Sequence, residues 1–88
     1  MTPLPAKVYR LTHLDGPGTI KAFCDVLVAD TLLLKSFRVL EGKHGLFIGM
    51  PREQGRDGHW YEQVIPMSQA MHQELERLIL TKYQRSRA

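Results

Sequence analysis

Apolar and polar residues alternate with a period of two along much of the first 65 residues of the chain. The clearest alternating run covers residues 19–29. One face of this run holds five apolar residues: Ile20, Ala22, Cys24, Val26 and Val28. Alternation of this kind is typical of a β-strand with one face in the core. We therefore predict a strand over 19–29 with these five side chains turned inward.

Three other stretches have weaker alternation and are predicted as strands: 8–14, 32–40 and 46–50. In the first of them, Val8 and Leu11 fall on opposite faces. In the second, Leu33, Phe37 and Val39 share one face. The run over 32–40 follows the clearest strand after a short polar pause, so a hairpin between the two is the economical interpretation.

Turn-forming sequences separate these strands. DGPG at 15–18 breaks the first from the second, and GKHG at 42–45 makes the later turn, with positive φ expected at both of its glycines. Gly49 is predicted to mark a bulge or a close approach of the backbone. Pro51 ends the strand over 46–50, because proline has no N–H to donate to a sheet.

The stretch 52–58, REQGRDG, contains no apolar residue and is predicted as a solvated loop. Strand character resumes over 59–65, where Trp60 and Val64 alternate with Tyr61 and Ile65. The chain therefore has a fifth predicted strand.

A helix is predicted to follow, beginning at Ser68, whose side chain can accept a hydrogen bond from the first turn. Its apolar stripe has helical spacing and comprises Met71, Leu75, Leu78, Ile79 and Tyr83. Leu80 lies about 100° around the helix from Ile79, at the margin of this stripe. We interpret Leu80 as a candidate contact with a partner or a second subunit.

These elements predict an α+β fold, with a small antiparallel β-sheet of four to five strands and a C-terminal α-helix packed on it. A chain of 88 residues is too short to divide its apolar residues between two cores, so a single domain is expected. We expect residues 1–6 to form a flexible N-terminal segment, 7–65 the sheet, 68–85 the helix and 86–88 a tail.

Composition limits the function classes. Apolar residues make up 43% of the chain and charged residues 24%, which is typical of a globular domain. The N-terminus lacks the apolar segment of a secretory signal, and no run approaches the roughly 18 apolar residues of a membrane span. We therefore expect a cytoplasmic protein with no membrane contact. The net charge of +3 permits attraction to polyanions.

Catalysis and metal binding find little support in the sequence. Cys24, the single cysteine, lies on the apolar face of the clearest strand, where a free cysteine behaves as a small hydrophobic residue. The four histidines have no close partner at metal-ligand spacing. We expect no enzymatic activity, no metal, no cofactor and no small-molecule substrate.

The glycines at 42, 45 and 49 allow two interpretations. GKHGLFIG has neither the lysine-serine ending of a P-loop nor the strand-to-helix context of a dinucleotide site, so a simple hairpin is favoured. In the alternative, backbone N–H groups and Lys43 also meet a phosphate. Arg38 likewise allows two roles, on the sheet surface in an ion pair or in contact with a ligand.

Basic residues gather near the C-terminus, where Arg77, Lys82, Arg85 and Arg87 follow one another with no acidic residue among them. Cations at this end of a helix also offset the helix dipole, by about 0.3–1 kcal/mol each. Their position therefore supports helix stability and anion binding alike.

The chain as a whole resembles the SpoVG family of small bacterial proteins. The matching residues include Lys21-Ala22, Asp30, Arg38-Val39, Glu41-Gly42, Gly45-Leu46-Phe47, Met50-Pro51, Asp57-Gly58, Pro66, Leu80, Tyr83 and Arg85. The resemblance covers about residues 7–85. The spacing of Gly-Leu-Phe, Met-Pro and Asp-Gly makes the pattern specific.

The resemblance implies a homodimer that binds DNA, with RNA as a second candidate, and regulates gene expression in septation or sporulation. This sequence departs from the family pattern after Pro51, where the usual adjacent basic pair is replaced by Glu53-Gln54 with an arginine on either side. We therefore expect the nucleic-acid contacts to come from a spread set: Lys43, Arg52, Arg56, Lys82 and Arg85. The alternative is a protein-interaction adaptor that uses a sheet edge or the helix surface near Leu80.

Overall fold

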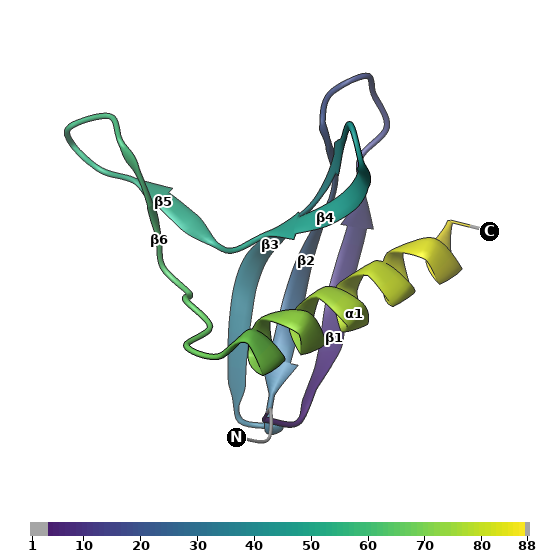
Figure 1. The fold of residues 1–88 in the computed structure, drawn as a ribbon, viewed down its shortest axis with the longest axis vertical. Helices are drawn as coiled ribbons and strands as arrows, with labels where there is room; N and C mark the ends of the chain where they lie inside the picture. Colours follow the sequence, from purple (N-terminus) through teal and green to yellow (C-terminus); the bar gives the residue numbers. More distant parts are fainter. Residues whose placement is uncertain (1–3, 88) are drawn as a thin grey trace.

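The structure is a computed structural model that describes residues 4–87, in which six strands precede one helix (Figure 1). The strands are β1 (Ala6–His13), β2 (Ile20–Val28), β3 (Leu32–Gly42), β4 (Gly45–Gly49), β5 (Arg52–Gln54) and β6 (Trp60–Glu62), and the helix is α1 (Gln69–Ser86). The predicted α+β fold is confirmed. β1 begins at Ala6, inside the segment expected to be flexible, and residues 1–3 and 88 lie outside the described part of the chain.

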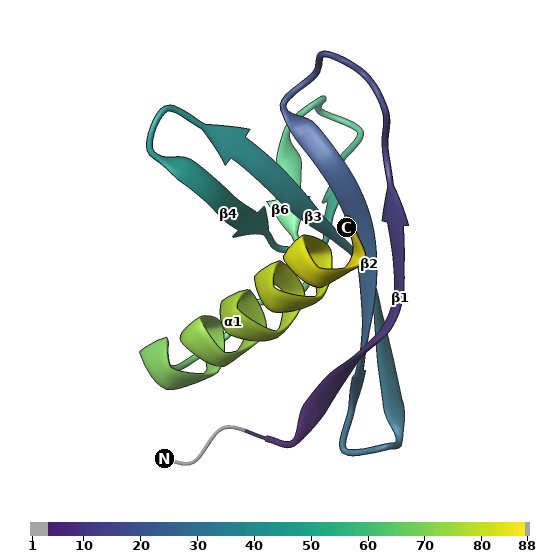
Figure 2. The same cartoon turned by 90° about the vertical axis from the view of Figure 1, so that its right-hand side faces the viewer.

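The main sheet has the strand order β1-β2-β3-β4, and every neighbouring pair is antiparallel. Helix α1 crosses one face of this sheet, and within residues 4–87 no helix lies on the opposite face (Figure 2). The core between sheet and helix is formed by eleven buried apolar residues of the described chain: Ala22, Cys24, Val26, Val28, Phe37, Val39, Ile48, Met50, Leu75, Ile79 and Tyr83. The predicted inward face of β2 is confirmed, with Ile20 half-buried at its start.

An irregularity in β3 changes which of its residues face the core. Cys24 of β2 pairs with Phe37, but Val26 pairs with Leu34, so β3 has one residue more than β2 over this interval. The bulge is held at Ser36, which has a φ of +75° and donates its N–H to Asp25 Oδ1 at 3.1 Å. As a result Leu34 packs against the core, and the prediction that Leu33 shares the face of Phe37 is wrong.

A second bulge shifts the pattern of β1. Val8 pairs with Val26 and Arg10 with Asp25, so that the residue between them on β1 is extra. Val8 and Leu11 therefore both pack against the core, although strict alternation predicts them on opposite faces.

The turn between β3 and β4 is the predicted hairpin. Gly45 has a φ of +113°, but Gly42 does not lie in the positive-φ region, contrary to expectation. A Cβ at Gly42 would instead meet the ring of Phe47 at 3.0 Å. The second glycine of the turn thus serves backbone conformation, and the first leaves room for an aromatic side chain.

Helix α1 begins as predicted, because the Ser68 side chain accepts a hydrogen bond from the Met71 N–H at 3.1 Å. Leu75, Ile79 and Tyr83 are buried in the core. Leu80 is half-buried and packs against the core. Its contact with a partner or a second subunit stays a prediction. Leu78, which the sequence places in the apolar stripe, instead lines a groove beside β1.

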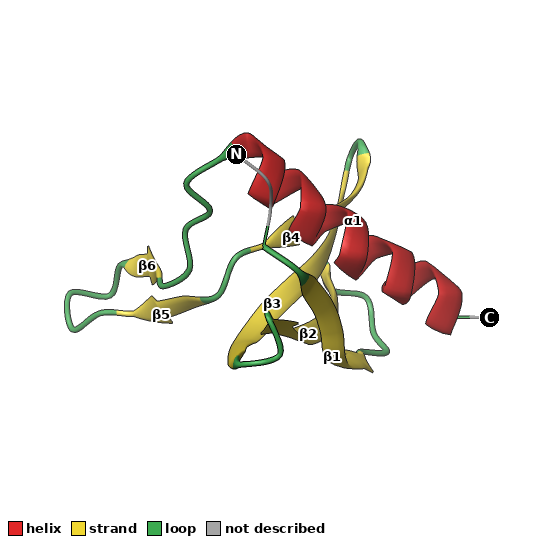
Figure 3. Ribbon diagram, turned by 90° about the horizontal axis from the view of Figure 1, so that it is seen from below, coloured by secondary structure: helices red, strands yellow, loops and turns green. Residues whose placement is uncertain are grey.

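Residues 52–62 form a separate two-stranded hairpin, which we call the arm, extending away from the main sheet (Figure 3). Two predictions are wrong here: Arg52–Gln54 is a strand rather than loop, and the strand near Trp60 does not join the main sheet. Pro51, which is buried and lacks an N–H, ends the β4 ladder before the arm begins. The Gln63 N–H donates to the Pro51 carbonyl at 2.7 Å and closes the base of the arm.

Candidate nucleic-acid interface

A groove between β1 and the C-terminal half of α1 gathers basic side chains. It has a volume of about 320 Å³ and is lined by Lys7, Val8, Arg77, Leu78, Thr81, Lys82 and Arg85. Four of these seven residues are cations and none is acidic. We call this surface the basic groove.

The floor and walls of the basic groove follow from the packing of α1 on the sheet. Val8 is held against the core on β1, and Leu78 faces it from the helix. On the helix, positions 77, 81, 82 and 85 lie on one side, because residues three to four apart project from the same face. Lys7 completes the cluster from the neighbouring strand.

Two of the four cations are partly engaged. Lys7 Nζ lies 3.2 Å from Asp30 Oδ1, and Arg77 forms an ion pair with Glu74. The Lys7 pair is strongly exposed, and exposed pairs contribute little and are easily exchanged for another anion. The hydrogen bond to Glu74 raises the pKa of Arg77. Lys82 and Arg85 form no ion pair with any residue in the described part of the chain.

The structure brings only two of the five predicted contact residues together. Lys82 and Arg85 share the basic groove, Arg52 and Arg56 lie on the arm, and Lys43 lies in the β3–β4 turn. Figure 1 shows these three places as separate parts of the molecule. Arg77, which belongs to the basic run near the C-terminus but not to the predicted contact set, also lines the groove. Lys7 is not among the predicted contacts either, because no local pattern connects it to a helix more than sixty residues later.

Arg52 is positioned by an aromatic neighbour. Its guanidinium carbon lies 4.5 Å from the centroid of the Trp60 ring, a cation–π contact across the two strands of the arm. Arg56 occupies the turn at the tip, where the Asp57 carboxylate accepts hydrogen bonds from the Tyr61 hydroxyl and the His59 N–H. These bonds lower the pKa of Asp57, so the tip carries a negative charge beside Arg56 at neutral pH.

The Arg38 side chain lies against the backbone at the end of β4. Its Nη2 donates to the Met50 carbonyl at 3.1 Å, and a Cβ at Gly49 would lie only 2.4 Å from the same nitrogen. Gly49 therefore marks a close approach, as predicted, made by the Arg38 side chain. Burial lowers the pKa of Arg38, and the nearby Arg52 charge lowers it further, against an opposing effect of Glu62.

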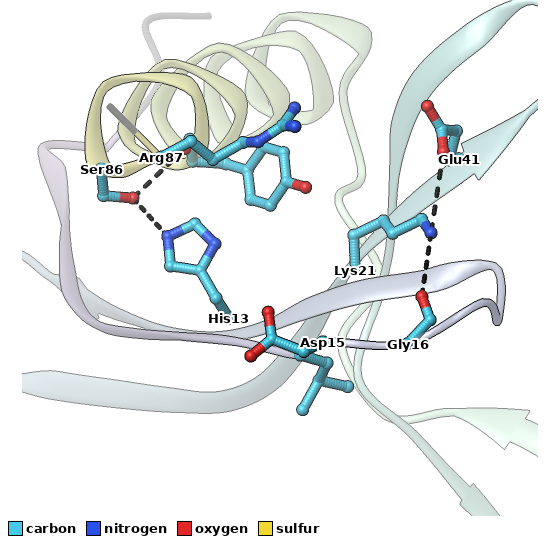
Figure 4. A pocket seen from close by; sticks show the side chains of 9 residues that line it. His13, Asp15, Gly16, Lys21, Glu41, Ser86 and Arg87 are labelled. Atoms are coloured by element: carbon cyan, nitrogen blue, oxygen red, sulfur yellow. Dashed lines mark hydrogen bonds and ion pairs between the residues drawn. The ribbon is translucent and has the colours of Figure 1, made fainter.

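A second hollow lies between the β1–β2 loop and the last turn of α1, with a volume of about 440 Å³ (Figure 4). His13 Nε2 lies 2.7 Å from Ser86 Oγ, which tethers the end of β1 to the helix. The charges of this hollow are mixed: Lys21 Nζ lies 3.8 Å from Glu41 Oε1, and Asp15 lines the same space as Arg87. This hollow is therefore less suited to a polyanion than the basic groove.

The chemical groups considered for catalysis lie apart from these surfaces. Cys24 is buried in the core, and burial is the main cause that raises its pKa to about 12, so the thiol is a poor nucleophile at neutral pH. Within residues 4–87 no three His, Cys, Asp or Glu side chains are grouped so that they could hold a metal ion. Nor does that part of the chain contain a helix long and apolar enough to cross a membrane.

Comparison with known proteins gives a consistent result. A family profile described as SpoVG matches residues 6–85. Proteins named "Putative septation protein SpoVG" are similar over most of their length: one from Agathobacter rectalis is 30% identical over 84% of this chain and 85% of its own. One from Staphylococcus carnosus is 30% identical over 84% of this chain and 69% of its own, and one from Brevibacillus brevis is 26% identical over 86% and 80%.

Proposed function

The chain belongs to the SpoVG family, and we propose that it is a dimeric, non-enzymatic cytoplasmic regulator that binds DNA, and RNA as a second ligand, through the basic groove. The observation that supports this proposal is the grouping of Lys7, Arg77, Lys82 and Arg85 around one groove without an acidic lining residue. Such a surface suits the phosphate backbone, which supplies most of the affinity in sequence-independent binding.

The dimensions of the groove favour contact with several phosphates. From Arg77 to Arg85 the helix rises about 12 Å, since each residue of an α-helix advances about 1.5 Å. Phosphates along one strand of a duplex are spaced by about 3.4 Å of helix axis, so the row is long enough to meet more than one. Contacts of this kind position a protein on the backbone and do not read the sequence.

Lys43, Arg52 and Arg56 are proposed as outer contacts in the same function. Glu53 and Gln54 stand where the family pattern has its adjacent basic pair, and Arg52 and Arg56 lie before and after them on the arm. Because the arm projects from the sheet, these cations can approach a long ligand whose main contacts lie elsewhere.

The dimer is supported by the apolar residues that the arm and the chain following it leave uncovered. Tyr61, Ile65 and Met67 are all exposed, and Met67 retains 91% of its accessible surface. Exposed apolar clusters of this kind mark surfaces that associate. A dimer would also double the number of basic grooves and so increase the avidity for a long polyanion.

The proposal is tested by binding to a duplex of 20 base pairs over a range of salt concentrations. If each of the four cations of a groove neutralises one phosphate, the logarithm of the binding constant should fall by about 3.6 for each tenfold rise in salt for every groove that binds, and by more where the outer contacts also meet phosphates. The Lys82→Ala/Arg85→Ala variant should reduce this slope by about 1.8 and weaken binding to all sequences alike.

Arg10→Ala/Lys35→Ala is the matched control, because it removes the same charge from two exposed residues that do not line the groove. It should leave the slope unchanged. If the two double variants reduce the salt slope equally, or if the protein does not bind the duplex at 50 mM salt, the proposal that the basic groove binds DNA is wrong. Sedimentation equilibrium on the same samples tests the dimer, and a monomer at micromolar concentration contradicts that part of the proposal.

A further inference from the structure

The face of the main sheet opposite α1 carries a row of residues that the basic groove does not use. Phe23 alternates with the buried Ala22 and Cys24 on β2, so its side chain lies on the other face. Direct pairing places Phe23 beside Arg38 of β3, and Arg38 beside Gly49 of β4. Figure 2 shows that α1 leaves this side of the sheet open.

Two aromatic side chains stand out from this open face. Phe23 of β2 keeps 41% of its surface accessible, and Phe47 of β4 keeps 45%. Phe47 pairs with Leu40, two residues along β3 from Arg38, so it lies on the same face as Arg38 and Phe23. The two rings thus flank Arg38 from the strands on either side of β3.

Arg38 presents a guanidinium that is incompletely satisfied. Nη2 is bonded to the Met50 carbonyl, whereas Nε is buried and has no hydrogen-bond partner among the described residues. A buried donor without a partner is costly and calls for an explanation, of which a bound water, ion or ligand is one. The absence of a side chain at Gly49 lets the guanidinium lie against the backbone.

The row continues onto the arm. Arg52 and Glu62 pair across β5 and β6, and both are near enough to Arg38 to affect its pKa. Arg52 in turn stacks on Trp60, which is 54% exposed. A row therefore runs from the sheet to the arm, in which two guanidinium groups, Arg38 and Arg52, lie between the rings of Phe23 and Trp60.

We infer that this open face binds single-stranded nucleic acid, with bases stacked on Phe23, Phe47 and Trp60 and the backbone near Arg38 and Arg52. Exposed rings on an antiparallel sheet are suited to unpaired bases, because every base has a π-face, and guanidinium groups add both charge and stacking. A duplex keeps its bases paired and stacked, so it cannot use these rings.

A second copy of the chain is the main competing occupant of this face. In a two-fold contact the same residues meet themselves or one another, which would bring Arg38 and Arg52 of two subunits close together. Like charges brought together at an interface oppose association. An anionic strand, by contrast, complements both guanidinium groups.

Trp60 is the only tryptophan in the chain and lies within the proposed site, so its fluorescence reports occupancy directly. Three probes are compared in titrations: a 12-nucleotide oligothymidylate, an abasic strand of the same length, and a duplex of 12 base pairs. The oligothymidylate should quench Trp60 and bind at least about tenfold more tightly than the abasic strand, which has equal charge but no bases. The duplex, whose bases cannot stack on the ring, should quench Trp60 much less than the oligothymidylate does.

The Phe23→Ser/Phe47→Ser variant should lose about tenfold or more in affinity for oligothymidylate and keep its affinity for the abasic strand. Leu32→Ser, an apolar-to-polar change at an exposed residue near the β2–β3 turn, is the matched control and should bind as the unmodified protein does. Circular dichroism should confirm that both variants fold.

Equal binding of the abasic strand and oligothymidylate, or unchanged binding by the phenylalanine variant, overturns the inference. So does an equal loss for both strands accompanied by dissociation of a dimer, which would assign the face to a second copy. Lys82→Ala/Arg85→Ala separates this site from the basic groove: loss of duplex binding with Trp60 quenching by oligothymidylate retained shows that the two surfaces act independently.

Discussion

The domain formed by β1–β4 and α1 differs from the arm in how each is stabilised. Every buried core residue belongs to the strands and helix of the first region or, in the case of Met50, directly follows β4. Among the strands of the arm no residue is buried. The first region therefore depends on apolar burial, whereas the arm depends on its hydrogen bonds and on its two attachment points at Pro51 and Val64.

The ionisable groups of the two regions differ in the same way. Burial raises the pKa of Cys24 in the core. In the arm, the Tyr61–Asp57 hydrogen bond raises the pKa of Tyr61 and lowers that of Asp57, although both side chains are exposed. The arm has exposed, hydrogen-bonded polar side chains and little buried apolar surface, which suits it to contact with a ligand. The packed core holds the arm in position.

The largest expected effect tests this contrast in stability. Phe37→Ala should lower the free energy of unfolding by about 3–5 kcal/mol, because it removes a fully buried ring from the core. Trp60→Ala removes a larger ring from the arm but should cost less than about 1 kcal/mol, mainly the cation–π contact with Arg52. Urea unfolding followed by circular dichroism, at one protein concentration, measures both. Similar losses for the two variants would show that the arm is part of the core.

A smaller effect is expected where the two regions meet. Gly49→Ala should cost about 1–3 kcal/mol, since the new methyl group would displace the Arg38 guanidinium. In an Arg38→Ala background the same change should cost much less, because nothing occupies that space. A double-mutant cycle by urea unfolding measures the coupling. Additive costs would indicate that the glycine is needed for another reason.

The smallest of these effects depends on pH. The Cys24 thiol has a pKa of 9.0 in the unfolded chain and of about 12 in the folded chain. Its contribution to the free energy of unfolding is therefore fully present below pH 9 and is lost progressively as the pH rises from 9 towards 12. At pH 10 the loss from this group should be about 1.4 kcal/mol. The comparison is with Cys24→Ala, which lacks the group and shares all other titrations. Parallel stability curves between pH 8 and 10.5 for the two proteins would show that the thiol is not held in the core.

Much of the core could be predicted from the sequence, because β2 alternates without interruption and α1 has a regular apolar stripe. The faces of β1 and β3 could not be predicted in full. Each has one extra residue, and at Ser36 the bulge depends on the carboxylate of Asp25, eleven residues earlier in the chain. A contact of this kind inverts the alternation beyond it, and no local pattern indicates it.

The candidate site was only partly predictable for a similar reason. Lys82 and Arg85 were found because they are close together in the sequence, but Lys7 reaches the same groove only through the packing of α1 on β1. The arm could not be predicted from its sequence. The pattern of REQ and WYE is equally compatible with a separate hairpin and with a loop followed by a fifth strand of the main sheet. The two structures differ in which strand pairs with which, and that pairing is decided by tertiary contacts.

The closed base of the arm has a consequence for covalent continuity. The Gln63 N–H bonds to the Pro51 carbonyl, and Val64 packs against the core, so the chain leaves the domain and re-enters it at neighbouring points. A break in the backbone at the exposed tip near Arg56 would leave both halves of the core with their contacts intact. The tip is therefore a natural place to open the chain, insert a label or join a second protein without rebuilding the domain that carries it.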